Sequence, residues 1–329
     1  MRIALIGRQC TGRTTLLRAL GGSDRLDPDK PVTIPVPDIR LDRLAGYYEP
    51  ERVVHASVTF TDTPSPVFTP RQLGTLQGSD ALVLVVDNFA TGELLESLED
   101  SEAHLMLSDL ERVEKRMDRL RKEGALRSRE YSLLSEVCEG LSDGRPLRTM
   151  DLSRDCLDFL SPYGLLSLKP LLVVSNRSSS PVTDEGGLET GTASAGGRFL
   201  RVDAAFELEL ADIEEEERPA FLSSMGYTGS ALDRLLRESY GLLDLITFFT
   251  VGKDEVRAWA IRRGTDARDA AGTIHSDMAR GFIRAQVIPF DTWEGCPDTN
   301  ELRACGAIGL EGKEYTVRDG DIIEVRFSV

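Results

Sequence analysis

The chain has 329 residues, a length typical of two or three domains. Hydrophobic residues make up 41% of the sequence, which is enough to form packed cores and excludes a largely disordered protein. The formal net charge is −16, so the surface as a whole repels nucleic acid. Any contact with RNA therefore requires a local basic patch.

The cysteines, the histidines and the hydropathy exclude further classes of protein. The five cysteines form no C-x-x-C pair, and with three histidines no spacing matches a zinc site. An odd number of scattered thiols is typical of a reducing compartment. No apolar run reaches the roughly 18 residues of a membrane span, and the first residues lead into a loop motif and not into a signal cleavage site. We expect a cytoplasmic protein without membrane contact.

Apolar runs predict the strands of a doubly wound, mostly parallel α/β sheet. The expected strands are Arg2–Ile6, Val53–Thr61, Ala81–Val86 and Leu171–Val174. A helix expected at Thr14–Leu20 follows the first of them. In such sheets ligands bind at the carboxyl ends of the strands, which is where the polar loops of this sequence stand.

The remaining segments predict two additions to this sheet and one loop. Apolar residues recur at helical spacing from Glu93 to Lys122 and from Tyr131 to Leu141, which predicts an inserted helical hairpin with charged outer faces. Ser178–Gly197, rich in Ser, Gly and Thr, is predicted to be a loop. From Leu245 onward a small α+β domain is expected, with one helix near Ala267–Met278. Its predicted strands lie at 248–251, 256–261, 285–288, 315–317 and 322–327.

The first strand leads into a glycine-rich loop. Gly7-Arg8-Gln9-Cys10-Thr11-Gly12-Arg13-Thr14 fits the P-loop pattern G-x-x-x-x-G-K-[ST] at every fixed position but one. In this pattern backbone N–H groups and a helix N-terminus hold phosphate. The predicted phosphate-binding residues are Gly7, Arg8, Gln9, Cys10, Thr11, Gly12, Arg13, Thr14 and Thr15. The alternative is a glycine loop without a ligand.

Two residues predict a site for Mg²⁺ bound together with nucleotide. Thr14 offers a hydroxyl to the metal, and Asp62, at the end of a predicted strand, is the expected carboxylate beside it. The departure from the pattern is Arg13, where lysine belongs, because a planar guanidinium is bulkier than an ammonium group. Arg13 either neutralises phosphate charge or displaces the nucleotide from the loop.

Several longer motifs make the sequence resemble the YchF family, the Obg-like ATPases of the TRAFAC P-loop class. The motifs are Pro35–Asp42 with Pro50–Val54, Gly241–Gly252 with Glu255–Trp259, Ala271–Asp277 with Arg280–Ala285, and Leu310–Tyr315 with Val317–Asp321. The resemblance implies a P-loop nucleotide-binding domain over 1–92 and 166–240, a helical insertion domain over 93–165, and a C-terminal β-grasp-like TGS domain over 241–329. It also implies contact with the ribosome or RNA.

The sequence departs from the family at the nucleotide site. Asp62-Thr63-Pro64-Ser65 lacks the switch glycine of the family's D-x-x-G turn, and no threonine stands where the first switch, within 22–32, supplies one to Mg²⁺. The family's base-reading N-x-x-E element keeps Asn176 and loses its carboxylate at Ser179. The next base-side element is retained as Asp203–Glu207. The resemblance therefore implies a base site of Asn176, Ala204 and Ala205 with weakened base discrimination.

These features favour a purine nucleotide-binding protein that binds ATP or GTP with Mg²⁺ and hydrolyses it slowly or not at all, because each missing part of a phosphoryl-transfer site costs rate. Ribosome contact through the TGS and helical domains is expected. A basic face of Arg262, Arg263, Arg280 and Arg284 is one interpretation, and ordinary surface charge is the other. The alternative function is a non-hydrolysing interaction scaffold with a vestigial P-loop.

Overall fold

The computed structural model describes residues 1–22, 30–63, 70–178, 181–214, 216–225, 227, 229–304 and 306–328. The chain divides into two compact units. Unit 1 comprises residues 1–34 and 58–242, and unit 2 comprises residues 35–57 and 243–329. Among the helices that the structure describes, none has the length and apolar content that crossing a membrane requires.

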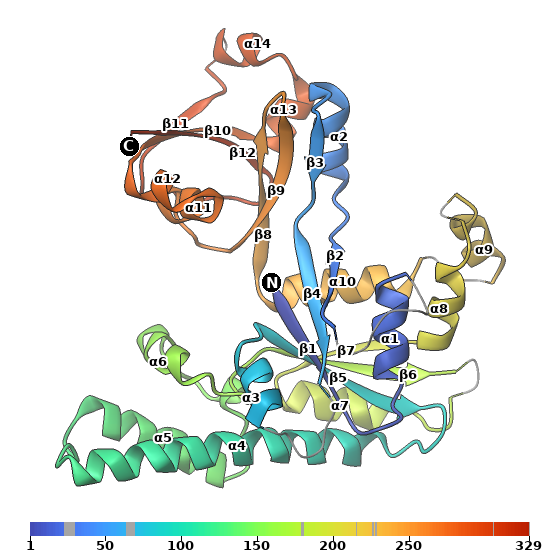
Figure 1. Cartoon of the computed structure of the whole chain (residues 1–329), viewed down its shortest axis with the longest axis vertical. Coiled ribbons are helices and arrows are strands. Elements are labelled where there is room, and N and C mark those ends of the chain that lie inside the picture. The colour runs from blue at the N-terminus through green and yellow to red at the C-terminus, as the bar shows by residue number, and fades with distance from the viewer. Residues whose placement is uncertain are drawn as a thin grey trace. The chain divides into compact units, whose positions relative to one another are not determined.

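Unit 1 is built on a six-stranded sheet with the strand order β2-β4-β1-β5-β6-β7 (Figure 1). Its strands are β1 (Arg2–Ile6), β2 (Val32–Pro35), β4 (Ser57–Asp62), β5 (Ala81–Asn88), β6 (Leu171–Arg177) and β7 (Arg198–Val202). The pairs β4–β1, β1–β5, β5–β6 and β6–β7 are all parallel. The expected mostly parallel α/β sheet is confirmed.

Helices cover both faces of this sheet. They are α1 (Arg13–Leu20), α3 (Pro70–Gln77), α4 (Leu94–Lys122), α5 (Arg129–Ser142), α6 (Arg154–Leu160), α7 (Gly186–Ser194), α8 (Ala204–Ala211), α9 (Arg218–Ser224) and α10 (Ala231–Leu242). Figure 1 shows α4 and α7 on one face and α1, α8 and α10 on the other. Because β5 is covered on both faces, all of its residues are buried, which explains its uninterrupted apolar run.

The expected helical insertion is present as α4, α5 and α6, with short 3₁₀ turns at Leu147–Thr149 and Ser161–Tyr163. Val113 and Met117 of α4 pack with Leu134 and Val137 of α5 in one apolar cluster. The buried carboxylate of Asp109 joins α4 to the returning chain, because it accepts hydrogen bonds from the N–H groups of Leu166 and Ser167 at 2.7 Å each. The charged helix α4 thus packs through one apolar side and is held to the returning chain at Asp109.

Unit 2 contains a second six-stranded sheet with the order β11-β10-β12-β8-β9-β3. Its strands are β3 (Arg52–Val54), β8 (Leu245–Val251), β9 (Glu255–Arg262), β10 (Phe282–Pro289), β11 (Gly309–Glu311) and β12 (Asp321–Phe327). Its helices are α2 (Ile39–Tyr48), α11 (Ala267–Ile274), α12 (Ser276–Arg280), α13 (Phe290–Gly295) and α14 (Thr299–Ala304). Residues 35–57 lie within the range 1–92 predicted for the nucleotide-binding domain. In the structure they contribute α2 and β3 to this second unit.

Three expectations about local structure are wrong. The expected strand 53–61 is two strands, since β3 belongs to the second sheet and β4 to the first. The expected loop 178–197 contains α7, whose Leu188 and Thr192 are buried one turn apart, so packing outweighs the weak helix propensity of its glycines. The expected strand at 315–317 is only an isolated bridge between Asp266 and Thr316.

Candidate functional site

The predicted phosphate loop joins β1 to α1 at the carboxyl edge of the first sheet. Three of its residues have positive φ: Gly7 at 143°, Cys10 at 63° and Gly12 at 85°. A Cβ on Gly7 would lie 2.3 Å from the carbonyl oxygen of Val85, so this position admits only glycine. Cys10 holds a left-handed conformation at a cost of about 1 kcal/mol. Such left-handed residues turn successive N–H groups into an anion-binding concavity, and strain of this kind is typical of functional sites.

Asn176 joins the phosphate loop to the first residue of α8. Its Nδ2 donates to the carbonyl oxygen of Thr11 at 2.9 Å, and its Oδ1 accepts from the N–H of Ala204 at 3.0 Å. A Cβ on Gly12 would lie 2.0 Å from Asn176 Nδ2, so the second glycine of the motif is required by this contact. The structure therefore brings together the predicted base-site residues Asn176 and Ala204 and the predicted phosphate loop. Ala205 lies exposed in the first turn of α8.

Thr14 and Asp62, the predicted metal ligands, are in direct contact. The Thr14 hydroxyl donates to Asp62 Oδ2 at 3.0 Å, while Asp62 Oδ1 is buried and accepts no hydrogen bond. In the described part of the chain, no three His, Cys, Asp or Glu side chains gather as a metal site. A hydroxyl and a carboxylate fit Mg²⁺, which takes one or two protein oxygens and completes its shell with water and phosphate.

Arg13 lies beneath the phosphate loop and is 7% exposed. Its Nη1 donates to the carbonyl oxygens of Gly7 at 2.6 Å and Thr63 at 3.3 Å. Its Nε lies 3.4 Å from Asp62 Oδ1 and makes no hydrogen bond. Burial lowers the pKa of Arg13, while the negative charge of Asp62 raises it by less. The guanidinium nevertheless keeps its proton, because the ordinary pKa of arginine is so high. The guanidinium thus bridges the loop and the end of β4, and retains an unused donor.

Arg8, at the outer side of the loop, contacts three carboxylates that precede or belong to α4. Its Nη1 donates to Glu93 at 3.0 Å, and its Nη2 donates to Glu96 at 3.0 Å and to Asp100. These hydrogen bonds, that with Asp100 first, raise the pKa of Arg8. From the sequence, Arg8 was predicted only as a phosphate-loop residue. Its additional role is to join this loop to the helical insertion.

Asp87 at the end of β5 was not singled out in the sequence. Its carboxylate accepts from the N–H groups of Phe89, Ala90 and Thr91 at 2.8 to 3.0 Å and from the Thr91 hydroxyl at 3.1 Å. Phe89 lies beside the loop, since its Cε1 is 3.7 Å from the Cβ position of Gly12. An acid at the carboxyl end of a central parallel strand was the signal that could have identified it.

The other expected site residues lie as follows. Gln9 is exposed at the tip of the loop, and Thr11 is buried with its hydroxyl donating to the Arg8 carbonyl at 3.1 Å. Thr15 is half-buried in α1. Ser65, Ser179 and most of the expected first switch lie outside the described residues.

Residues 245–328 match the family model of the YchF GTPase C-terminal domain, which carries the description "Protein of unknown function (DUF933)". Full-length relatives match as well. The ribosome-binding ATPase YchF of Bacillus subtilis is 32% identical, and the match covers 99% of this chain and 98% of that protein. The corresponding protein of Haemophilus ducreyi is 31% identical over 100% of this chain and 99% of its own.

A solved structure shows the same architecture. The YchF GTPase of Schizosaccharomyces pombe superimposes with a TM-score of 0.88 at 26% identity, covering 99% of this chain and 97% of that one. The strand–loop–helix of the phosphate loop, the helical insertion and the C-terminal sheet unit thus occur in one chain, as the motifs predicted. This chain belongs to the YchF family of ribosome-binding ATPases.

Proposed function

We propose that this chain binds ATP or GTP together with Mg²⁺ at the phosphate loop and hydrolyses the nucleotide slowly or not at all, as a cytoplasmic, ribosome-associated protein. The observation that carries the proposal is the preformed loop: it has positive φ at Gly7, Cys10 and Gly12, and Asn176 holds it from one side. Preformed N–H groups bind phosphate without a further ordering cost.

In this proposal three groups of residues divide the work. The segment Gly7–Thr15 holds the phosphates, Thr14 and Asp62 hold Mg²⁺, and Asn176, Ala204 and Ala205 line the base site. The bound ion would neutralise the outer phosphates. In this proposal 1–92 and 166–240 bind nucleotide, 93–165 form the helical arm and 241–329 form the TGS domain, except that residues 35–57 contribute α2 and β3 to the second unit.

Slow hydrolysis is supported by Arg13 and by the sequence of the switch turn. Arg13 is bound to two backbone carbonyls and faces Asp62, so its charge is partly committed before a nucleotide arrives. Ser65 stands where the family has the glycine whose N–H holds the γ-phosphate. Because phosphoryl transfer depends on positioned charge, both features lower the rate and leave ground-state binding possible.

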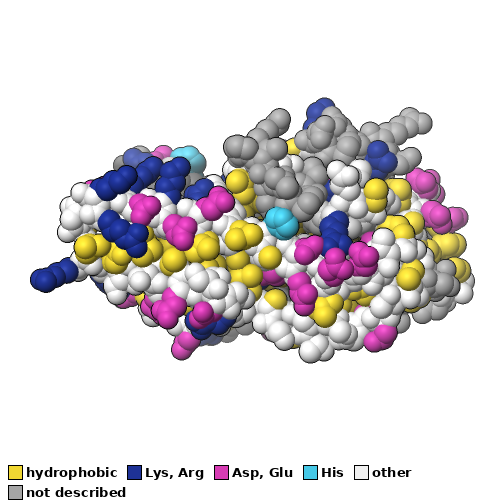
Figure 2. All heavy atoms as spheres, turned by 90° about the horizontal axis from the view of Figure 1, so that it is seen from below, with side chains coloured by type: hydrophobic (Ala, Val, Ile, Leu, Met, Phe, Trp, Pro, Cys, Tyr) yellow, Lys and Arg dark blue, Asp and Glu magenta, His cyan; other side chains and the backbone are white. Residues whose placement is uncertain are grey.

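Ribosome engagement is proposed through the helical arm and the C-terminal domain. The lining of a surface hollow of about 460 Å³ beside α4 includes Arg112, Lys115 and Arg119, which recur on one side of the helix, together with the single acid Glu111. Lys115 and Arg119 are exposed and have no partner among the described residues. On the face that Figure 2 draws, both signs of charge are interspersed, so an RNA contact requires such a local cluster.

The predicted basic face of the C-terminal domain is partly neutralised. Arg263 pairs with Asp244, and Arg280 pairs with Asp277. Arg262 and Arg284 are exposed. The helical arm therefore offers the clearer cationic surface of the two, and the ribosome test is best made there.

Calorimetry with ATP, GTP and their non-hydrolysable analogues, with and without Mg²⁺, tests nucleotide binding. We expect Thr14→Ala to weaken binding of the Mg²⁺ complex more than binding of free nucleotide, and Thr14→Ser to restore it. Equal weakening of both would remove Thr14 from the metal site. If wild type binds neither nucleotide at millimolar concentration, the phosphate-binding proposal is wrong.

The alternative, a non-hydrolysing scaffold, is favoured by one observation: Arg13 and Asn176 hold the loop through hydrogen bonds within the protein. Co-sedimentation with ribosomes tests partner binding for either function. We expect Lys115→Gln with Arg119→Gln to lower co-sedimentation, and the control Arg127→Gln with Arg154→Gln, which removes equal charge from exposed sites on the same insertion, to leave it unchanged. Equal loss in both variants would refute the α4 surface.

A further inference from the structure

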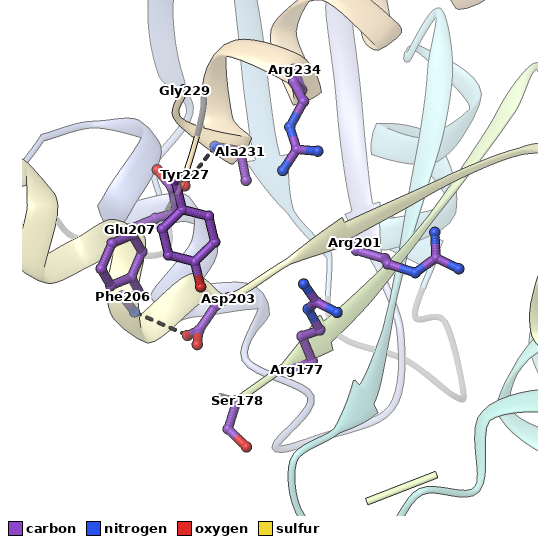
Figure 3. A pocket seen from close by; sticks show the side chains of 10 residues that line it. All are labelled: Arg177, Ser178, Arg201, Asp203, Phe206, Glu207, Tyr227, Gly229, Ala231 and Arg234. Atoms are coloured by element: carbon purple, nitrogen blue, oxygen red, sulfur yellow. Dashed lines mark hydrogen bonds between the residues drawn. The ribbon is translucent and has the colours of Figure 1, made fainter. Parts of the chain in front are cut away.

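The base side of the candidate site contains a small hollow at the carboxyl ends of β6 and β7 (Figure 3). It measures about 110 Å³, and its lining includes Arg177, Ser178, Asp203 and Tyr227. Pockets that hold a whole small molecule usually measure about 300–1,000 Å³, so this hollow admits the edge of a base and not a whole nucleotide. Its lining residues are therefore candidates for contact with the edge of a bound base.

The pairing of β6 with β7 places Asp203 at this hollow. Asn176 and Val202 are Cα partners at the ends of these parallel strands, so Asp203 is the residue that directly follows the partner of Asn176. The next residue, Ala204, donates its N–H to Asn176 Oδ1 at 3.0 Å. Because Asn176 also holds the phosphate loop at Thr11, the position of Asp203 is fixed relative to that loop.

The carboxylate of Asp203 has one oxygen in use and one available. Its Oδ1 accepts from the N–H of Phe206 at 3.0 Å as the N-cap of α8, and Figure 3 draws this bond as a dashed line. Within the described residues, its Oδ2 accepts no hydrogen bond and neither oxygen belongs to an ion pair. An ionised carboxylate can accept about four hydrogen bonds, so Asp203 keeps acceptor capacity for a ligand.

The other acid in the lining, Glu207, is already engaged. Both of its oxygens accept hydrogen bonds, one from the Ser230 hydroxyl at 2.7 Å and one from the Ala231 N–H at 2.6 Å. Three arginines also line the hollow: Arg177, Arg201 and Arg234. Because positive and negative side chains are mixed there, the lining suits the neutral, hydrogen-bonding edge of a base better than it suits a phosphate.

The sequence has no acid where the N-x-x-E element would supply one, because that position is Ser179. The exocyclic amines of adenine and guanine are hydrogen-bond donors, and an ionised acceptor binds such a donor more strongly than a neutral one does. Asp203 offers an ionised acceptor from the neighbouring strand end, next to the partner of Asn176. A carboxylate at position 203 can thus supply what position 179 lacks.

We propose that Asp203 Oδ2 accepts a hydrogen bond from the exocyclic amine of a bound purine and so replaces the missing base-reading acid. This inference rests on the proposed function and deepens it, since it predicts base discrimination where the motifs alone predict its weakening. Capping of α8 does not require a carboxylate, because serine and asparagine cap helices as well. Asp266, the N-cap of α11 in the second unit, makes the same kind of capping bond at 2.8 Å and is a matched control.

Calorimetry of the full chain with two pairs of Mg²⁺–nucleotides tests the proposal. The pairs are ATP with purine riboside triphosphate and GTP with ITP, and the second member of each lacks the exocyclic amine. For whichever of ATP and GTP binds more tightly, we expect loss of the amine to weaken binding to wild type about tenfold. In Asp203→Ser, which keeps a capping oxygen, this ratio should fall to about one. Asp203→Asn keeps the size of the side chain and should also lower the ratio, because a neutral amide is a weaker acceptor.

The control Asp266→Ser should keep the wild-type ratio. Inorganic triphosphate, which has no base, should bind equally to wild type and to Asp203→Ser, because the phosphate loop is the same in both. An unchanged ratio in Asp203→Ser, or weaker binding of triphosphate by this variant, would overturn the proposal. Nucleotide binding by wild type without discrimination for the amine would contradict this assignment alone. Failure of wild type to bind any of the nucleotides would contradict the proposed function and this assignment together.

Discussion

The side chain of Asn176 donates to the main-chain carbonyl oxygen of Thr11 at 2.9 Å. These residues are 165 positions apart in the sequence, and the same side chain also receives the N–H of Ala204. One buried amide therefore fixes the distance between the predicted phosphate loop and the predicted base side of the site. This contact gives Asn176 a structural role that does not depend on contact with a base.

We expect Asn176→Ala to lower the free energy of unfolding by about 2 kcal/mol, because the Thr11 carbonyl and the Ala204 N–H lose their partner. It should also weaken nucleotide binding, since the loop is no longer held. Urea unfolding and calorimetry measure the two effects. Asn88→Ala is the control, because the side chain of this buried asparagine makes two hydrogen bonds with the main chain of Thr183. The substitution should lower stability by a similar amount and leave nucleotide affinity unchanged. Equal loss of affinity in both variants would contradict a specific role for Asn176.

The central strands and the phosphate loop could be predicted because their signals are local. β1, β5 and β6 are continuous apolar runs that end in polar residues, and the glycine spacing follows β1 directly. The two glycines are required because Val85 and Asn176 leave no space for a Cβ at these positions. The sequence pattern identifies the glycines but does not show these contacts. The contact of Thr14 with Asp62 was also foreseeable, since Thr14 opens the helix that follows β1 and Asp62 ends the neighbouring strand β4.

The remaining features depend on pairing between distant residues. The charges of Arg8 and Glu93 are visible in the sequence, but their contact spans 85 positions and is set by the packing of α4. The segment 53–61 alternates as one strand should, yet β3 pairs with β9, about 200 residues later, and β4 pairs with β1. Local periodicity identifies a strand but contains no information about which sheet it joins.

Arg13 provides a second prediction, since it is the counter-charge of a buried acid. Arg13→Met should lower the free energy of unfolding by about 3 kcal/mol, because the Asp62 side chain, 9% exposed, loses its cationic neighbour. Arg13→Lys keeps the charge and should cost less than about 1 kcal/mol. Urea unfolding compares the two.

Arg13→Lys should also raise affinity for the Mg²⁺–nucleotide complex, because a compact ammonium leaves more space under the loop and can reach the outer phosphates. Calorimetry with ATP checks this. If the lysine variant binds no tighter than wild type, arginine is not the group that limits nucleotide binding, and the switch turn becomes the main cause of any weak affinity.

The contacts of Arg8 with α4 predict an electrostatic coupling that depends on salt. All four side chains are partly exposed, so a double-mutant cycle of Arg8→Ala and Asp100→Ala should give a coupling of about 1 kcal/mol at low salt and much less in 1 M salt. The exposed pair Arg121 and Asp118 on the same helix is the control and should give a smaller coupling at both salt concentrations. A coupling that is insensitive to salt would show that packing, and not charge, joins Arg8 to the helix.

Asp87 predicts how the stability of the β5 end depends on pH. Burial raises the pKa of Asp87, but the hydrogen bonds from Phe89, Ala90 and Thr91 together lower it by more. The pKa of the folded protein therefore lies below the ordinary value. In the unfolded chain this carboxyl group has a pKa of about 3.9. Its stabilising contribution is therefore complete above that pH and is lost as the pH falls through the lower folded pKa.

Asp87→Asn replaces one accepting oxygen by an amide group, so some of these N–H donors lose their acceptor. We expect the variant to be about 1–3 kcal/mol less stable than wild type at pH 7. The difference should narrow as the pH falls from about 3.9, the pKa in the unfolded chain, toward the lower pKa of the folded protein. Urea unfolding at a series of pH values measures it. Asp143→Asn, at an exposed ion pair with Arg145, should show little difference at any pH. A difference for Asp87→Asn that stays constant down to pH 3 would mean that the loop beside Gly12 is held by the shape of this side chain and not by its charge.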